Sequence, residues 1–217
     1  MNIVQPSAHM CISSGLAGIE MLRRIEYIGR ISHRSEDKQT DDSWQRFIPS
    51  VVMGHGDLSI IEHESVTVEA EVDRGVSHEW VRHRLGAYTQ ESTRFVNYDK
   101  PGQEPRFIMP MLGPNETLNW EQAVEQACTS YRELLALGQT PQIARSVLPN
   151  SLATKLVITY NLRMWRHFFI MRTTREAHPQ MKQVSIPLLK EFQDNIPILF
   201  DDIEPNAKQS ESMRLLR

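Results

Sequence analysis

The sequence predicts an α+β fold in which helices outnumber strands, built as a single domain. Residues 65–73 alternate apolar Val66, Val68, Ala70 and Val72 with polar neighbours, a period of two that is typical of a strand with one wet face. Residues 15–31 instead repeat apolar side chains at steps of three, the pattern of an amphipathic helix. A chain of 217 residues is long enough to bury one core of this mixed kind.

The other elements follow from local signals taken in chain order. Polar residues 32–42 predict a loop, and the Asp41-Asp42-Ser43 cap predicts a helix to about Met53, where Gly54 and Gly56 favour a bend. The further expected elements are helices over 77–85, 115–137, 163–175 and 178–193, a short helix beginning at Pro141, and strands over 106–110 and 155–161. The tail after about residue 203 is polar and predicts a flexible end.

Composition narrows the class of protein. With 24 basic and 27 acidic residues the net charge is -3, which argues against a surface that binds a nucleic-acid polymer. Cys11 and Cys128 have no metal or redox spacing, which suits a reducing compartment. The N-terminus lacks the pattern of a secretion signal, and no run approaches the roughly 20 apolar residues that span a bilayer. We therefore expect a cytoplasmic protein that does not enter membranes.

The stretch from Arg82 to Arg94 carries the densest polar chemistry, with three arginines, a histidine and three hydroxyl groups in thirteen residues. Arginine presents a rigid fork of donors that matches phosphate, and a neighbouring hydroxyl can complete the hydrogen bonds of its oxygens. Clustered arginines are also often solvated or paired with acids, so the residues alone leave a surface loop and a phosphate site equally open.

This stretch also resembles the signature of the flavin-dependent thymidylate synthases, Arg-His-Arg followed by seven residues and Ser, here Arg82 to Ser92. Two positions depart from the commoner pattern: Gln90 stands where an acid is frequent, and Phe95 where a tyrosine is frequent. A neutral amide still hydrogen-bonds, whereas Phe95 lacks one hydroxyl donor. We expect altered affinity before lost activity.

Two further clusters extend the resemblance. Asn161, Arg163 and Arg172 keep the family's spacing of an Asn, an Arg two residues on and an Arg nine residues later. Residues 59–63 match the family's Glu-His segment, while the preceding Gly-His is displaced by two residues, so either His55 or Asp57 takes the place of the family's histidine. A zinc site here is disfavoured because the spacing fits no common pattern. Weaker matches lie at residues 29–32, at Glu79 and at residues 144–149.

The resemblance covers roughly residues 25 to 180 and implies a small, mostly antiparallel sheet flanked by helices. It implies methylation of dUMP to dTMP, with methylenetetrahydrofolate as carbon donor and FAD, reduced by NADPH, as hydride source. It also implies a homotetramer with active sites between subunits. No cysteine nucleophile is expected, because Cys11 and Cys128 lie outside the matched segments.

The site residues are assigned from the resemblance. Arg172 is the catalytic residue, whose charge activates the pyrimidine. The substrate-binding residues are Glu79, Arg82, Gln90, Glu91, Ser92, Thr93, Arg94, Arg145 and Arg172. The cofactor-binding residues are Ser32, His55, Ser59, Glu62, Arg82, His83, Arg84, Leu85, Asn161, Arg163 and His167. Ser92 is expected to bind a ligand rather than act as a nucleophile, since no activating base is evident beside it. No metal is expected.

Three alternatives remain open. A non-catalytic flavin- or nucleotide-binding homologue is favoured by the displacement at His55 and by Gln90. A related enzyme that leaves a hydroxymethyl group on the pyrimidine is a closer variant. A small RNA-binding protein is favoured only by arginines and aromatics, and is opposed by the net acidity.

Overall fold

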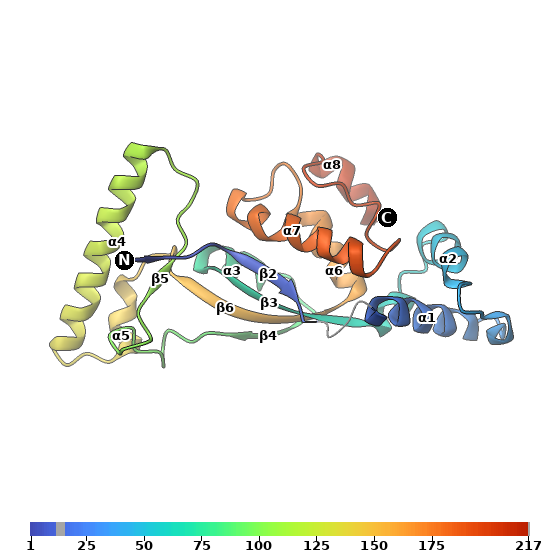
Figure 1. The fold of residues 1–217 in the computed structure, drawn as a ribbon, viewed down its shortest axis with the longest axis horizontal. Helices are drawn as coiled ribbons and strands as arrows, with labels where there is room; N and C mark the ends of the chain where they lie inside the picture. Colours follow the sequence, from blue (N-terminus) through green and yellow to red (C-terminus); the bar gives the residue numbers. More distant parts are fainter. Residues whose placement is uncertain (12–15, 217) are drawn as a thin grey trace. The chain divides into compact units, whose positions relative to one another are not determined.

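The computed structural model describes residues 1–11 and 16–216 of the chain and confirms the α+β class (Figure 1). The strands are β1 (Asn2–Ile3), β2 (Ser7–Met10), β3 (Ser65–Asp73), β4 (Ala87–Gln90), β5 (Arg106–Phe107) and β6 (Ala153–Asn161). The α-helices are α1 (Leu16–Ile31), α2 (Trp44–Phe47), α3 (Arg74–Trp80), α4 (Pro114–Ala136), α5 (Pro141–Ala144), α6 (Leu162–Arg172), α7 (Pro179–Asn195) and α8 (Gln209–Ser212). Short 3-10 turns and one π-helix connect them.

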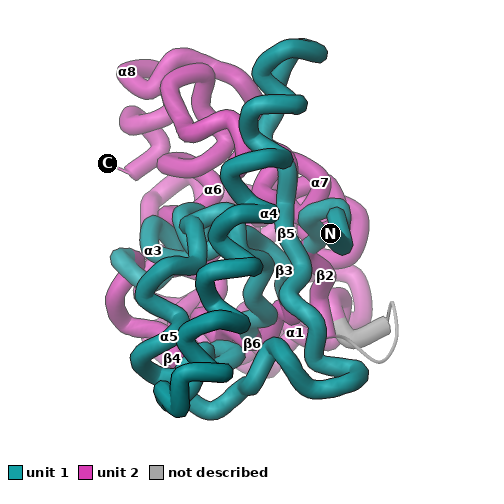
Figure 2. The backbone as a smooth tube through the Cα atoms, turned by 90° about the vertical axis from the view of Figure 1, so that its left-hand side faces the viewer, with its two compact units in different colours: residues 1–7, 70–82, 89–156 teal, residues 8–69, 83–88, 157–217 magenta. Residues whose placement is uncertain are grey.

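The chain divides into two compact units, each assembled from three separate segments (Figure 2). Unit 1 contains residues 1–7, 70–82 and 89–156, and unit 2 contains residues 8–69, 83–88 and 157–217. The division passes through β3, β4 and β6, so each unit holds part of these strands. A single domain remains a prediction.

The four-stranded sheet has the order β2-β3-β6-β4. In unit 2, β3 and β6 run antiparallel, because Thr67 shares a hydroxyl hydrogen bond of 2.8 Å with Thr159 and the Leu162 amide donates to the Glu64 carbonyl at 2.9 Å. In unit 1, β1 pairs in parallel with β5 through Asn2 and Arg106. The predicted strand over 65–73 is confirmed residue for residue.

The core of unit 2 is an aromatic cluster centred on α6. Trp165 packs against Tyr160 at a ring-centroid distance of 4.6 Å and against Phe192 at 5.1 Å. Its indole nitrogen donates to the Val66 carbonyl at 2.9 Å, which satisfies the one polar atom of a fully buried ring. Helix α6 packs against α7 and α8, so its buried face is fixed on several sides.

Unit 1 has its own smaller core, where α4 packs on the segments around β5. The buried side chains are Tyr98, Phe107, Val124, Cys128, Tyr131, Ala144 and Leu152. The Tyr131 hydroxyl accepts a hydrogen bond from the Tyr98 amide at 3.3 Å. The predicted helix over 115–137 is confirmed within one residue at each end, because its apolar positions share one face.

Several elements differ from the sequence-based expectation. The helix predicted to about Met53 consists of α2 and a π-helix over Ile48–Gly54, and the helix predicted over 163–175 ends at Arg172. The helix predicted over 77–85 spans Arg74–Trp80 instead, because the Asp73 side chain accepts from the Val76 amide at 2.8 Å and starts the helix earlier. The strand predicted over 106–110 is limited to Arg106–Phe107. The tail, whose flexibility remains a prediction, contains α8 and a 3-10 turn, and the Asn206 amide donates to the Thr173 carbonyl at 2.7 Å.

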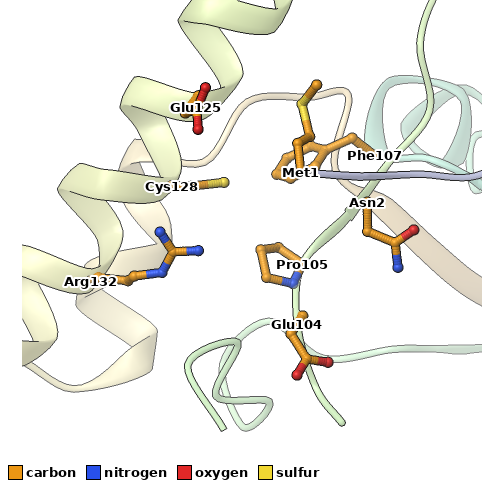
Figure 3. Close-up of a pocket in the computed structure, with 8 residues that line it drawn as sticks. All are labelled: Met1, Asn2, Glu104, Pro105, Phe107, Glu125, Cys128 and Arg132. Carbon is orange, nitrogen blue, oxygen red and sulfur yellow. The ribbon is translucent and has the colours of Figure 1, made fainter. Parts of the chain in front are cut away.

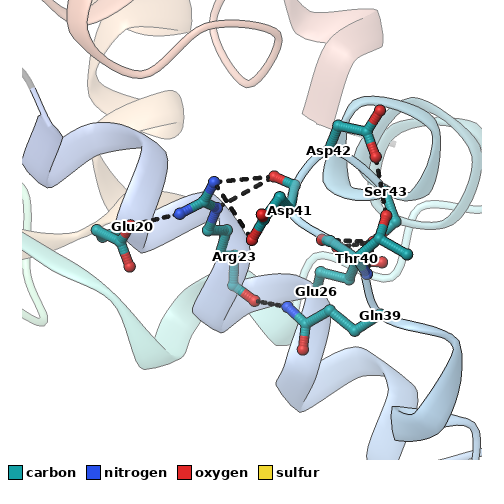
Figure 4. Close-up of polar contacts among 8 residues, drawn as sticks. All are labelled: Glu20, Arg23, Glu26, Gln39, Thr40, Asp41, Asp42 and Ser43. Carbon is teal, nitrogen blue, oxygen red and sulfur yellow. Dashed lines mark hydrogen bonds and ion pairs between the residues drawn. The ribbon is translucent and has the colours of Figure 1, made fainter.

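The loop over residues 32–43 is tied to α1 by polar contacts (Figure 4). Gln39 Nε2 donates to the Arg23 carbonyl at 2.8 Å, and the Ser43 hydroxyl donates to Glu26 Oε2 at 2.8 Å. Glu26 is fully buried and is ion-paired with Arg30 at 2.7 Å. A buried carboxylate needs such partners, so these contacts hold the loop in one place. No helix among the described residues is long and apolar enough to cross a membrane.

Candidate functional site

The Arg-His-Arg signature lies in a turn segment, of which Arg82 belongs to unit 1 and residues 83–88 belong to unit 2. Residues 81–86 form turns and bends between α3 and β4. Leu85 has a φ of 68°, a left-handed conformation that is rare for a residue with a branched side chain. A Cβ added to Gly86 would lie 2.2 Å from the Tyr160 ring, so only glycine fits there. Arg84 and Leu85 are consequently turned out to solvent.

His83 points inward from this turn and meets Arg172. Arg172 Nε donates to His83 Nε2 at 2.8 Å, and His83 is 6% exposed. Burial, together with the charge of Arg172 and the neighbouring His167, lowers the pKa of His83 to about 3. The imidazole is therefore neutral at physiological pH and carries its proton on Nδ1, because Nε2 accepts the arginine bond.

Two tyrosines complete this group of contacts. The Tyr88 hydroxyl donates to the His83 carbonyl and shares a second hydrogen bond with the Tyr160 hydroxyl. Burial raises the pKa of Tyr88, and the bond from Tyr160 opposes that rise. Neither tyrosine was among the predicted site residues. Tyr88 lies inside the signature and Tyr160 directly precedes Asn161, so position along the chain was the only signal for them.

Helix α6 and its N-cap carry Arg163 and Asn161, two of the predicted flavin residues. Asn161 caps its first turn, with Oδ1 accepting from the Met164 amide at 2.8 Å. Arg163 forms an ion pair with Glu62, so two residues predicted to bind flavin separately are in contact. Both side chains are about half exposed, which leaves the guanidinium within reach of an external anion.

The remaining flavin candidates of unit 2 are Ser32, His55, Ser59 and His167. The Ser32 hydroxyl donates to the Gly29 carbonyl at 2.8 Å, while His55 and Ser59 are exposed. His167 lines a cavity of about 170 Å³ together with Arg163 and the C-terminal Leu215 and Leu216. Among the described residues, no cluster of three or more metal-binding side chains is present.

Unit 1 brings together the predicted phosphate residues. Arg145 Nη1 donates to the hydroxyl of buried Thr93 at 2.8 Å, and Arg94 Nε donates to Gln142 Oε1 at 3.0 Å. The Ser92 hydroxyl accepts from the Arg94 amide at 3.3 Å, and the Arg94 guanidinium lies over the Phe95 ring, 5.4 Å from its centroid. Both arginines are exposed, so their charge is available to an anion.

Glu91 and Gln90 have partners within unit 1. Glu91 accepts from the Tyr98 hydroxyl at 3.0 Å and lies 3.8 Å from Arg106, which also pairs with Glu71. Gln90 Nε2 donates to the hydroxyls of Ser77 at 3.1 Å and Thr154 at 3.2 Å. Glu91 lines a cleft of about 470 Å³ with Arg106 and Lys155, two cations absent from the predicted site. Glu79 lies in α3, and the Arg82 amide donates to its carbonyl at 3.3 Å.

A second cavity of unit 1, of about 290 Å³, contains none of the predicted site residues (Figure 3). It is lined by Met1, Asn2, Glu104, Pro105, Phe107, Glu125, Cys128 and Arg132. The Cys128 side chain points from α4 toward Met1 in Figure 3. Burial raises the pKa of this thiol, which keeps it protonated and poorly reactive.

Comparisons with known proteins identify the family of the chain. The family model for thymidylate synthase complementing protein, Thy1, matches residues 8–198. The chain is 30% identical to a flavin-dependent thymidylate synthase of Pyrococcus furiosus over 85% of this chain and 75% of that protein. It is 33% identical to one of Corynebacterium aurimucosum over 82% of this chain and 78% of that protein.

The fold has a match among solved structures. The UMP/dUMP methylase PolB of Streptomyces cacaoi, crystallised with 5-Br dUMP, superposes with a TM-score of 0.76 over 93% of this chain and 96% of that one, at 23% identity. The chain belongs to the family of flavin-dependent thymidylate synthases, and the predicted family, fold class and enzyme class are confirmed. The roles of individual site residues remain predictions.

Proposed function

We propose that this protein methylates dUMP to dTMP, taking the carbon from methylenetetrahydrofolate and using FAD that NADPH reduces. The observation that carries the proposal is the part-buried contact of Arg172 with a buried, neutral His83, which holds a cation on α6 next to the signature turn. A fixed cation of this kind stabilises negative charge that develops on a pyrimidine carbonyl as carbon 5 attacks.

The donor set fits a flavin. Arg163 is exposed beside Glu62 and suits the pyrophosphate, whereas the Asn161 amide is fixed by its capping bond and offers Nδ2 as a donor. When bound, the flavin supplies hydride chemistry that no side chain of the protein can perform. The protein contributes position and charge.

Arg94, Arg145 and Ser92 would hold the substrate phosphate. Arg145 is already oriented by Thr93 and Arg94 by Gln142, so less side-chain freedom is lost on binding. Charge-assisted hydrogen bonds from two guanidinium groups then fix the nucleotide. The homotetramer and the cytoplasmic location that the sequence predicts are part of the same proposal.

The test is product analysis by mass spectrometry after anaerobic incubation of the purified protein with dUMP, methylenetetrahydrofolate, FAD and NADPH, with each component omitted in turn. We expect dTMP that requires every component. The Arg172→Ala variant should keep its flavin spectrum and lose most turnover. Folded, flavin-loaded protein that makes no modified nucleotide would refute the proposal, and a hydroxymethyl product would favour the variant reaction.

A further inference from the structure

We propose that the hydroxyl pair of Tyr88 and Tyr160 is a positioning device that fixes Arg172 through His83 and so sets the rate of turnover. This inference rests on the proposed function of Arg172 as the cation that activates the pyrimidine. Both tyrosines act through another residue and do not bind the substrate.

The first step is the bond between Arg172 and His83. A hydrogen bond of 2.8 Å to Nε of arginine fixes the plane of the guanidinium, because Nε lies at the root of that group. The orientation of Arg172 therefore depends on where the imidazole of His83 lies.

The second step is the packing that limits the imidazole. Its ring contacts His167 edge-on at a centroid distance of 5.7 Å and Phe168 at 5.2 Å. Phe168 and Arg172 are four residues apart on α6 and share one face of the helix. The ring of His83 is thus packed against the helix that carries its hydrogen-bond donor. Van der Waals contacts are not directional, so they do not by themselves fix the orientation of the imidazole on that helix.

The third step is the tie on the backbone of His83. The Tyr88 hydroxyl donates to the His83 carbonyl, so a five-residue distance along the chain is closed into a loop. Gly86, inside this loop, lies against the Tyr160 ring with no room for a Cβ. A backbone held this closely carries the imidazole with it, since only two side-chain torsions separate them.

The fourth step is the anchor of Tyr88. Tyr160 is 1% exposed, and its ring packs on Trp165 in the core of unit 2. The Tyr88 ring meets the Tyr160 ring edge-on at 5.8 Å, and the two hydroxyls are hydrogen-bonded. The chain of contacts therefore runs from the rigid core to the signature turn and on to Arg172. Because Tyr160 is buried, it cannot reach a substrate.

The experiment compares Tyr88→Phe with Tyr131→Phe, a matched variant that removes one tyrosine hydroxyl in the core of unit 1. We expect Tyr88→Phe to lower kcat roughly tenfold, the effect of one lost hydrogen bond, with the KM for dUMP and the flavin affinity unchanged. Tyr131→Phe should leave kcat unchanged. Equal kcat in Tyr88→Phe and the wild type, or a change confined to KM, would overturn the proposal.

A second readout does not need activity. In protein labelled with ¹⁵N-arginine, the Nε–H signal of Arg172, assigned with Arg172→Lys, reports the bond to His83. We expect this signal to shift in Tyr88→Phe and in Tyr160→Phe, and to stay in place in Tyr131→Phe. A signal that stays in place in all three variants would overturn the positioning role. If the wild-type protein made no dTMP, the proposed function would be refuted. The Arg172 signal would still test whether the tyrosine hydroxyls are coupled to Arg172.

The double variant distinguishes two cases: the two hydroxyls act through their shared hydrogen bond, or each hydroxyl affects kcat independently. If the tyrosines act as a pair, Tyr88→Phe with Tyr160→Phe lowers kcat no further than Tyr88→Phe alone, because the same link is already broken. If the fold-changes in kcat of the two single variants multiplied in the double variant, each hydroxyl would act separately, and the proposed pair would be refuted.

Discussion

Arg145 donates a hydrogen bond to the buried hydroxyl of Thr93, so an arginine that follows α5 is fixed to the signature segment 52 residues earlier in the chain. Thr93 is the residue between Ser92 and Arg94, and its hydroxyl faces inward while the two arginines remain exposed. This contact brings two predicted phosphate residues from distant segments into one place in unit 1.

Arg94→Ala and Arg145→Ala should each raise the KM for dUMP at least roughly tenfold, because a charge-assisted hydrogen bond contributes about 1.5–3 kcal/mol. The measurement is steady-state kinetics with dUMP and with deoxyuridine, which lacks the phosphate. Arg132→Ala removes an exposed arginine of α4 that is predicted to play no part and should leave KM unchanged. Equal losses with dUMP and deoxyuridine would remove both arginines from the phosphate site.

Arg163→Ala should weaken FAD binding by roughly tenfold and barely change thermal stability. The ion pair with Glu62 is half exposed, and such pairs contribute about 0–1 kcal/mol to folding. Flavin fluorescence titration gives the affinity, and a thermal melt of the apoprotein gives the stability. A lower melting temperature with unchanged FAD affinity would mean that the pair is structural only. Lys190→Ala breaks a comparable exposed pair with Asp194 and serves as the control.

Gln90→Glu should destabilise the fold by roughly 1–3 kcal/mol, although it restores the acid common in the family. The amide donates to two buried hydroxyls, and Ser77 already uses its own hydrogen on the Arg74 carbonyl at 2.9 Å. A carboxylate cannot donate a hydrogen bond. The carboxylate of the variant would therefore face the Ser77 hydroxyl oxygen with no hydrogen between the two oxygens. Urea denaturation measures the change. Undiminished stability in Gln90→Glu would show that the two hydroxyls reorient freely.

Stability should fall as the pH drops from about 6.5 toward 3, because the pKa of His83 is lowered to about 3 in the folded state. Over this range the unfolded chain binds a proton that folded His83 does not, so the free energy of unfolding decreases by at most about 1.4 kcal/mol per pH unit from this group. Burial and Arg172 also lower the pKa of His167, which acts in the same direction.

The check for this dependence is urea denaturation between pH 4 and 7.5. His83→Gln keeps an acceptor for Arg172 without a titrating group and should flatten the slope. His78→Gln, an exposed histidine of α3, should retain the slope of the wild type. Identical slopes in all three proteins would place the buried neutral imidazole in doubt.

Local patterns explain which parts of the fold the sequence predicted. The apolar and polar residues over 65–73 alternate because successive side chains of a strand point to opposite faces, and β3 has those bounds. The start of α3 was missed because the Asp73 cap depends on a side-chain bond that periodicity does not contain. The polarity of the tail gave no signal for α8 or for the hydrogen bond from the Asn206 amide to the Thr173 carbonyl, and the flexibility of the tail remains a prediction.

The sequence by itself determined the α+β class, the family and the identity of the candidate site residues, because periodicity and motif spacing are properties of the chain alone. Only the tertiary structure decided which of those residues meet. It placed His83 against Arg172 and Arg163 against Glu62, and it added a contact between Tyr88 and Tyr160, two residues outside the predicted site that lie 72 positions apart. Such pairings arise when distant strands and helices pack, and burial, hydrogen bonding and pKa shifts follow from that packing rather than from neighbours in sequence.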